Sequence, residues 1–273
     1  MIEAAVLLAA IGAADLVRAP VSGRVAGAVL GAVAGVVVIA SGATLTDAAL
    51  WAAFVMGVLL ALWLWGMTPA HGEDPRRIWP ALIVLVAVAA SVVALPATHT
   101  ASGGVTDWFA ETAPGEAGMS WTTAVVTLGV GLFLLRSTNL LVRSAISSRA
   151  AARASGGADA APRPTLASGA QGWRVRIARV AVADVERVAA SGRGPQLVGG
   201  RVIGPIERLL LVGLGLAGAA AVIAALVAAK GVVRFPEISA DRGTGGSAET
   251  FLVGSLTSWA VAAAGALLIW VTF

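Results

Sequence analysis

The feature that most constrains this chain is a series of long apolar runs with few interruptions. We delimit seven of them, at about 2–17, 25–41, 48–67, 79–95, 120–142, 209–229 and 250–271. About twenty apolar residues in a helix cross the roughly 30 Å hydrocarbon layer of a membrane, whereas the strands of a membrane barrel alternate apolar with polar residues. The runs therefore predict an all-α, polytopic transmembrane helix bundle of about seven spans.

Composition supports this class and excludes several others. Of 273 residues, 58% are hydrophobic and only 12% are charged, against about a quarter charged in a soluble domain. The chain has no cysteine, which excludes disulfides and cysteine-type metal sites. Its high isoelectric point comes from an arginine-rich composition typical of a GC-rich bacterial genome, so we predict no nucleic-acid partner. We expect a multi-pass protein of the bacterial cytoplasmic membrane.

The placement of arginines predicts an orientation. With the N-terminus outside and the C-terminus inside, sixteen of the nineteen basic residues fall in cytoplasmic segments. The three exceptions are Lys230, Arg234 and Arg242, which fall on the outer side. The positive-inside rule favours this arrangement.

Between the fifth and sixth runs lies the one long polar segment. We expect an N-terminal membrane part at 1–143, a cytoplasmic linker at 144–204 and a C-terminal membrane part with two spans at 205–273. Within the linker, 173–189 has its valines on one side of a helical wheel and most of its arginines on the other. This pattern predicts a basic amphipathic helix, which either lies on the anionic leaflet or packs against the bundle or a partner.

Two glycine patterns occur in predicted spans. Gly23, Gly27, Gly31 and Gly35 recur every four residues, which predicts a close helix–helix contact, within one chain or between chains of a homo-oligomer. The sequence GLGLAG at 213–218 matches the dinucleotide-binding fingerprint, but it lies inside a predicted span rather than after a strand. We therefore predict no nucleotide cofactor.

The sequence contains few residues suited to catalysis. The two histidines, His71 and His99, lie in predicted loops, and the group of His71, Glu73 and Asp74 is more typical of a solvated turn than of a metal site. We therefore assign no catalytic residue, no metal and no cofactor, and leave open whether the chain is an enzyme. Asp15 is the one acid well inside an apolar run. It is either a functional intramembrane acid or the partner of Arg18 at the edge of the membrane.

Two polar clusters are the candidate binding sites for lipid or another anion. The first cluster is expected at the inner membrane surface and comprises Arg136, Asn139, Arg143, Glu207 and Arg208. The second is expected at the outer surface and comprises Lys230, Arg234 and Glu249. In each cluster the spacing of three or four residues puts side chains on one helix face. Salt bridges that fix helix packing are the first interpretation, and a site for an anion or a lipid headgroup is the second.

The same residues carry a family resemblance. The segments LLRSTNLLVR at 134–143, GRVIGPIERL at 200–209, AAKGVVRF at 228–235 and ETFLVGSL at 249–256 resemble the bacterial membrane family catalogued as domain of unknown function 3307. The resemblance covers about 134–273. In the first helix, Asp15 matches an aspartate of that family, and Ile11 stands where the family has a histidine. The resemblance implies a membrane location and no particular reaction.

Three functions are compatible with these patterns. The first is a non-enzymatic membrane subunit that binds anionic lipid headgroups or a partner protein. The second is a transporter of a small solute or ion, and the third is a lipid-modifying enzyme.

Overall fold

The computed structural model of the chain describes residues 1–45, 50–67, 78–94, 109, 111, 119–156, 173–177, 180–185, 200–240 and 246–273. The histidines at 71 and 99 and the acids at 73 and 74 lie outside these residues, as does Arg242. The helices are α1 (Ile2–Arg18), α2 (Arg24–Leu45), α3 (Leu50–Met67), α4 (Trp79–Ala94), α6 (Trp121–Leu135), α7 (Ser137–Gly156), α8 (Gly200–Leu216), α9 (Ala220–Ala240) and α10 (Gly246–Trp270). Two strands, β1 (Trp173–Ile177) and β2 (Val180–Val185), complete the described structure.

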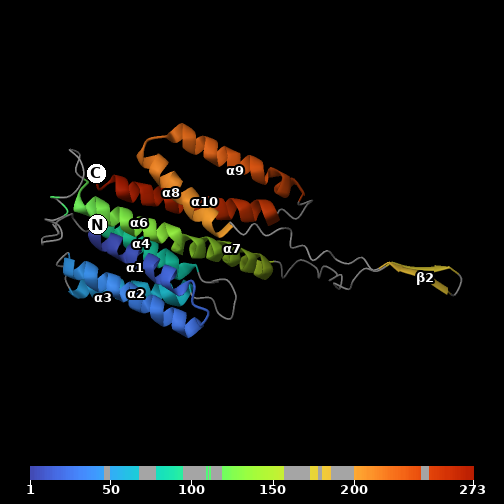
Figure 1. Ribbon diagram of the computed structural model, residues 1–273, viewed down its shortest axis with the longest axis horizontal. Helices are drawn as coiled ribbons and strands as arrows, with labels where there is room; N and C mark the ends of the chain where they lie inside the picture. The colour runs from blue at the N-terminus through green and yellow to red at the C-terminus, as the bar shows by residue number, and fades with distance from the viewer. Residues whose placement is uncertain are drawn as a thin grey trace.

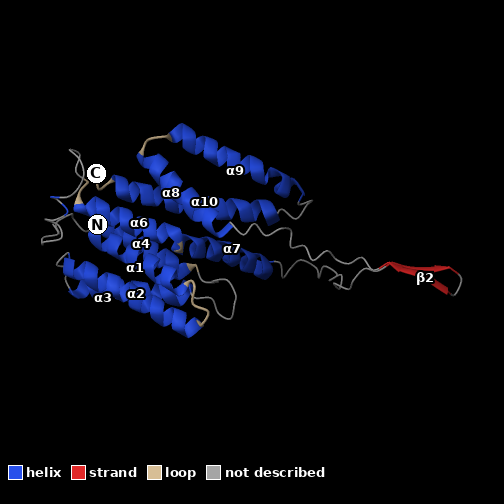
Figure 2. Ribbon diagram, viewed as in Figure 1, coloured by secondary structure: helices blue, strands red, loops and turns tan. Residues whose placement is uncertain are grey.

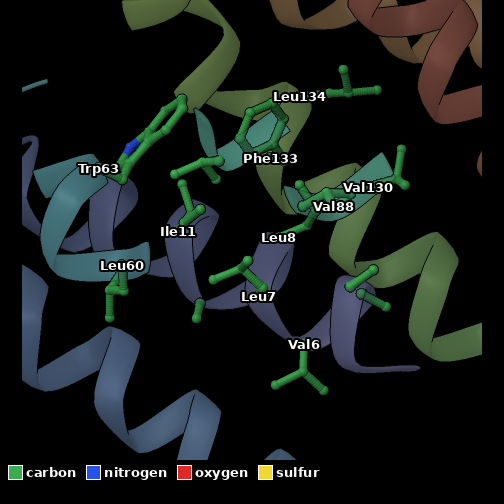
Figure 3. Packing of buried hydrophobic residues seen from close by; sticks show 14 of the residues in the cluster. Val6, Leu7, Leu8, Ile11, Leu60, Trp63, Val88, Val130, Phe133 and Leu134 are labelled. Carbon is green, nitrogen blue, oxygen red and sulfur yellow. The ribbon is translucent and has the colours of Figure 1, made fainter. Parts of the chain in front are cut away.

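The helices run roughly along one direction and form an elongated bundle (Figure 1). Helix α1 is its central element, since it packs against α2 on one side and α6 on another. Ala5, Ala10, Ile11 and Ala14 of α1 have no exposed surface, because small residues let the neighbouring helices approach closely. Figure 3 shows the side chains of Leu7, Leu8 and Ile11 among those of α3, α4 and α6.

The outer helices expose their apolar faces. Val25, Val29 and Val33 of α2 and Leu50 and Phe54 of α3 are more than half exposed, and these contiguous surfaces suit contact with lipid chains. Three described helical segments are long and apolar enough to cross a membrane, namely Val25–Leu45, Leu50–Met67 and Ala248–Trp270. A fourth results if α6 and the start of α7 count as one bent span. The fold is thus a helix bundle with three or four candidate membrane spans.

The fifth apolar run is bent rather than straight. Helices α6 and α7 meet at an angle of 46° around Arg136, whose backbone departs from helical geometry. The bend interrupts the helical hydrogen bonds near the end of α6. Thr138 Oγ1 therefore donates to the carbonyl of Phe133 over 3.3 Å, which satisfies one acceptor that the bend exposes.

The prediction of one continuous sixth span at 209–229 is wrong. The chain turns back between α8 and α9, where Gly218 adopts a φ of +69°, and the amide of Ala219 donates to the carbonyl of Leu214 over 2.9 Å. Only glycine adopts this conformation without strain, so Gly218 ends α8 in the manner of a helix C-cap. Hydropathy did not reveal the turn because both arms of this hairpin are apolar.

The hairpin also changes the predicted placement of the chain ends. Both termini lie at the same end of the bundle in Figure 1, and Thr123 Oγ1 at the start of α6 donates to the carbonyl of Thr272 over 2.9 Å. A bundle with seven spans would put the termini on opposite sides. The extra reversal between α8 and α9 accounts for the difference.

The predicted amphipathic helix at 173–189 is not observed. Strands β1 and β2 pair antiparallel in that segment, with Trp173 opposite Val185 and Ile177 opposite Val180, and they are the only strands among the described residues (Figure 2). The sequence WRVRI of β1 alternates apolar and basic residues, and three of the six residues of β2 are valine. Period-two alternation and β-branched side chains favour a strand over a helix, which is the physical reason for the difference.

Candidate functional site

Asp15 belongs to a polar cluster at the end of α1. Its carboxylate is fully buried and lies 2.7 Å from Arg18 Nη2, and the indole Nε1 of Trp63 in α3 donates to it over 3.0 Å. Arg18 also donates to the carbonyl of Met67, the last residue of α3, over 3.4 Å. Of the two interpretations of Asp15, the geometry favours a carboxylate paired with Arg18. The hydrogen bonds of this pair with Trp63 and Met67 connect α1 to α3.

The predicted glycine stripe lies mainly on the face of α2 that meets α1. A Cβ atom added to Gly31 would lie 3.0 Å from the carbonyl oxygen of Ala14, and one added to Gly35 would lie 2.5 Å from a methyl group of Leu60. Gly27 faces the carbonyl of Arg18, while Gly23 precedes α2 and has only Ala26 of that helix nearby. For the last three glycines of the stripe, then, the close neighbours belong to the same chain.

Arg208 of α8 lies against the bend between α6 and α7. It is 2% exposed, and its Nε donates to the carbonyl of Leu134 over 3.1 Å. Its Nη2 donates to Asn139 Oδ1 over 2.7 Å, and its Nη1 donates to the hydroxyl of Ser258 in α10 over 3.3 Å. One guanidinium thereby joins four helices and satisfies a carbonyl near the bend.

Glu207, the neighbour of Arg208, points to the other side of α8 and pairs with α9. Lys230 Nζ lies 2.7 Å from both carboxylate oxygens of Glu207. The indole Nε1 of Trp259 in α10 donates to Glu207 Oε1 over 2.9 Å, and Lys230 Nζ lies 5.4 Å from the centre of the Trp259 ring. A cation over an indole face is attracted by the ring's electrons, so both groups hold Lys230 in place.

The hairpin therefore brings together residues that the sequence analysis assigned to opposite membrane surfaces. Glu207 and Lys230, which were assigned to opposite surfaces, form a direct ion pair. Arg208 and Asn139, which were both assigned to the inner cluster, form a direct hydrogen bond. Arg136 is half-buried at the bend, and Arg143 is exposed on α7. The separation into an inner and an outer cluster is wrong, because it assumed a continuous helix between Arg208 and Lys230.

A pocket of about 500 Å³ lies between the ends of α9 and α10 next to this ion pair. Lys230 and Arg234 line it from α9, and Thr250 and Ser255 line it from α10. A second, apolar pocket of about 470 Å³ lies between α8, α9 and α10, with Trp259, Ala263 and Trp270 in its wall. Helix α9 stands apart from the rest of the bundle in Figure 1. Both pockets are lined by residues of α9 and α10.

Sequence reasoning found part of this site. It identified Lys230, Arg234 and the neighbouring Glu249, which is half-buried in the first turn of α10. It missed the hydroxyl groups of Thr250 and Ser255. The available signal was the spacing of Gly246, Thr250 and Gly254, which places small and hydroxyl side chains on one face of α10.

Comparison with protein-family profiles, curated proteins and solved structures finds no match to this chain. The resemblance to domain of unknown function 3307 stays a prediction from the quoted motifs.

Proposed function

We propose that this chain is a non-enzymatic, multi-pass protein of the bacterial cytoplasmic membrane that binds an anionic lipid headgroup between α9 and α10. The observation that carries the proposal is the pocket lined by two cations and two hydroxyl groups, Lys230, Arg234, Thr250 and Ser255. Ammonium and guanidinium groups donate charge-assisted hydrogen bonds to phosphate oxygens, and a serine hydroxyl also donates one, whereas the Thr250 hydroxyl donates to the carbonyl of Gly246 over 2.7 Å. The set therefore suits a phosphate-containing headgroup.

The contacts of Lys230 support this role. A charged side chain near hydrocarbon is costly, and such residues usually pair with an opposite charge or mark a binding site. Glu207 supplies the opposite charge, and the Trp259 ring lies 5.4 Å from the ammonium group. Lys230 keeps 30% of its side-chain surface exposed and lines the pocket.

The distribution of charge supports an orientation. Arg18 ends α1 and Arg234 lies in the last third of α9, and these helix ends lie away from the chain termini. Basic residues accumulate on the cytoplasmic side, where the leaflet carries anionic lipids. We therefore propose that the headgroup site faces the cytoplasmic leaflet and that both termini lie outside.

Thermal unfolding in nanodiscs tests the headgroup site. Replacing phosphatidylcholine with phosphatidylglycerol is expected to raise the Tm, because a ligand that binds only the folded state stabilises it. Arg234→Gln is expected to reduce the affinity for phosphatidylglycerol about tenfold, as for the loss of one charge-assisted hydrogen bond.

Arg143→Gln is the matched control, because Arg143 is an exposed arginine of α7 that does not line the pocket. It is expected to leave the effect of phosphatidylglycerol unchanged. An equal Tm in the two lipids, or an equal loss in R143Q and R234Q, would contradict the proposal.

A further inference from the structure

The apolar pocket of about 470 Å³ begins at the end of the bundle where the chain turns between α8 and α9. Leu216 of α8 and Ile223 of α9 flank this turn, and Trp270 is the last residue of α10. The turn and the C-terminus lie at the same end of the bundle in Figure 1. The pocket extends from there to Trp259, near the middle of the span Ala248–Trp270, so it occupies the half of that span next to the C-terminus.

This pocket has the depth of one leaflet. Trp259 and Trp270 are eleven residues apart, which corresponds to about 16 Å along a helix at 1.5 Å per residue. Half of the roughly 30 Å hydrocarbon layer is about 15 Å. Tryptophan is enriched at membrane interfaces, and Trp270 is more than half exposed. The pocket thus spans the hydrocarbon of the leaflet at the terminal end of the bundle, from the interface to the membrane centre.

A polar network closes the deep end of the pocket. The indole Nε1 of Trp259 donates to Glu207, and Lys230 Nζ lies 5.4 Å from the centre of the Trp259 ring. Lys230 follows Val227, a lining residue of α9, by three residues. Charged groups are unfavourable neighbours for hydrocarbon. An apolar ligand therefore fits the pocket with its end at Trp259 and does not continue to Lys230.

The pocket is continuous with the apolar outer surface of the bundle. Leu267 and Trp270 line it and are both more than half exposed. Val222 of α9, the neighbour of the lining residue Ile223, is also more than half exposed. Such contiguous apolar surfaces suit contact with lipid chains. A lipid chain can thus reach the pocket without crossing a polar barrier.

The width of the pocket distinguishes a lipid chain from a protein helix. A volume of about 470 Å³ over a length of about 16 Å corresponds to a mean cross-section of about 30 Å². A helix with its side chains is about 10–12 Å wide, which corresponds to roughly 80–110 Å². The pocket is therefore too narrow for a helix of a partner or of a second copy. An apolar cavity of about 150 Å³ holds one benzene ring, so three times that volume suits roughly eighteen carbon atoms, the size of one acyl chain.

We propose that this pocket holds one acyl chain of a phospholipid from the leaflet at the terminal end of the bundle, with the chain entering beside Trp270 and ending at Trp259. The chain fills the space between α9, which stands apart in Figure 1, and the neighbouring α8 and α10. Lipid chains are as apolar as helix faces, so close packing in the pocket, rather than removal from water, retains the chain. The proposal rests on the membrane location in the proposed function and does not depend on the headgroup site at Lys230 and Arg234.

Photocrosslinking tests the place and direction of the chain. The full-length protein is placed in nanodiscs of phosphatidylcholine that carries a diazirine either near the carboxyl end or near the terminal methyl of one acyl chain, and labelled residues are mapped by mass spectrometry. The first probe is expected to label Leu267 and Trp270, and the second Val227 and Trp259. The reverse order would overturn the proposal, because the chain would then come from the other leaflet. Absence of label on Val227 from both probes would also overturn it, because the pocket would then be covered by protein.

Ala263→Phe tests whether the label arises in the pocket rather than from lipid around the bundle. Ala263 lines the pocket, so the added ring is expected to reduce the label on Val227 from the second probe severalfold. Ala260→Phe, at an exposed position outside the lining, is the matched control and is expected to leave this label unchanged. Label on Val222, which is exposed outside the lining, is the internal reference in each sample. An equal loss of label on Val227 in the two variants would overturn the proposal.

Gly215→Leu fills the pocket from α8 and provides a second variant. A Cβ atom added to Gly215 would lie 3.7 Å from its nearest neighbour, the methyl group of Ala266, so this position accepts a side chain. The same severalfold loss of label on Val227 is expected. Label that persists in both G215L and A263F would overturn the acyl-chain site and leave the headgroup site standing. An equal Tm in phosphatidylcholine and phosphatidylglycerol would overturn only the headgroup site, since the crosslinking uses phosphatidylcholine.

Discussion

Among single residues, the buried charges do the most to define this bundle. Asp15 and Arg18 form an ion pair in the N-terminal half, whereas Arg208 makes its hydrogen bonds to two neutral side chains and a carbonyl. These arrangements respond differently to substitution, because breaking an ion pair leaves a lone charge, whereas removing Arg208 leaves neutral acceptors without donors.

Replacing Asp15 with asparagine is expected to destabilise the protein by about 3–5 kcal/mol, because Arg18 would keep a largely buried charge without its carboxylate. The double variant D15N/R18Q is expected to recover part of this loss. Unfolding free energies of the two single variants and the double variant give the coupling energy. A coupling energy near zero would contradict the importance of the pair.

Replacing Arg208 with methionine is expected to destabilise the protein by about 1–3 kcal/mol, since the carbonyl of Leu134 would lose its donor inside the bundle. The matched control Arg143→Met removes an exposed arginine from α7 and is expected to change stability by no more than about 0.5 kcal/mol. Chemical denaturation of both variants in the same detergent measures the difference. Equal stabilities would show that Arg208 does not support the bend.

Among the helices, α1 decides how closely the others pack. Gly129 of α6 lies directly against the carbonyl of Ala5, while Gly131, two residues later in the same helix, has no atom within 4 Å of the place where a Cβ would lie. The sequence alone does not distinguish the packed glycine from the unpacked one, since both occur in the same apolar run.

The two glycines give opposite predictions. Gly129→Ala is expected to destabilise the protein by about 1–3 kcal/mol, because the added methyl group would force α1 and α6 apart. Gly131→Ala is expected to stabilise it by up to about 1 kcal/mol through helix propensity. Thermal unfolding of the two variants compares them directly, and the same sign for both would contradict the described packing of α6 on α1.

For the bundle as a whole, the reversal between α8 and α9 decides the topology. A single continuous span at 209–229 would bury Ala217 near the middle of the membrane, whereas the hairpin puts it at a turn. The absence of cysteine from the chain makes this difference measurable, since any introduced thiol is unique.

Ala217→Cys is expected to react with a membrane-impermeant maleimide added outside intact cells, and Arg143→Cys only after the cells are opened. The physical reason is that the turn and α7 lie toward opposite ends of the bundle (Figure 1). The fraction of labelled protein by gel shift provides the measurement. An unreactive Ala217→Cys in both conditions would favour a continuous span.

Local signals in the sequence determined the class of this protein and most of its helices. Long apolar runs require helices because a membrane offers no partner for free backbone groups, and this holds regardless of how the helices pack. The same reasoning selected Asp15, Glu207, Arg208 and Lys230 as residues that need an explanation. The helix predicted at 173–189 is wrong for the described residues of that segment, which form β1 and β2. Helical periodicity and strand alternation both occur in this stretch of sequence.

Only the tertiary structure decided which of these residues meet. The positive φ of Gly218 reverses the chain and carries Lys230 back to Glu207, and the bend at Arg136 presents a carbonyl to Arg208. Hydropathy averages over many residues, so it does not register a turn of a few residues between two apolar arms. The apolar runs thus predicted a membrane bundle, while the reversal at Gly218 determined where its charges gather.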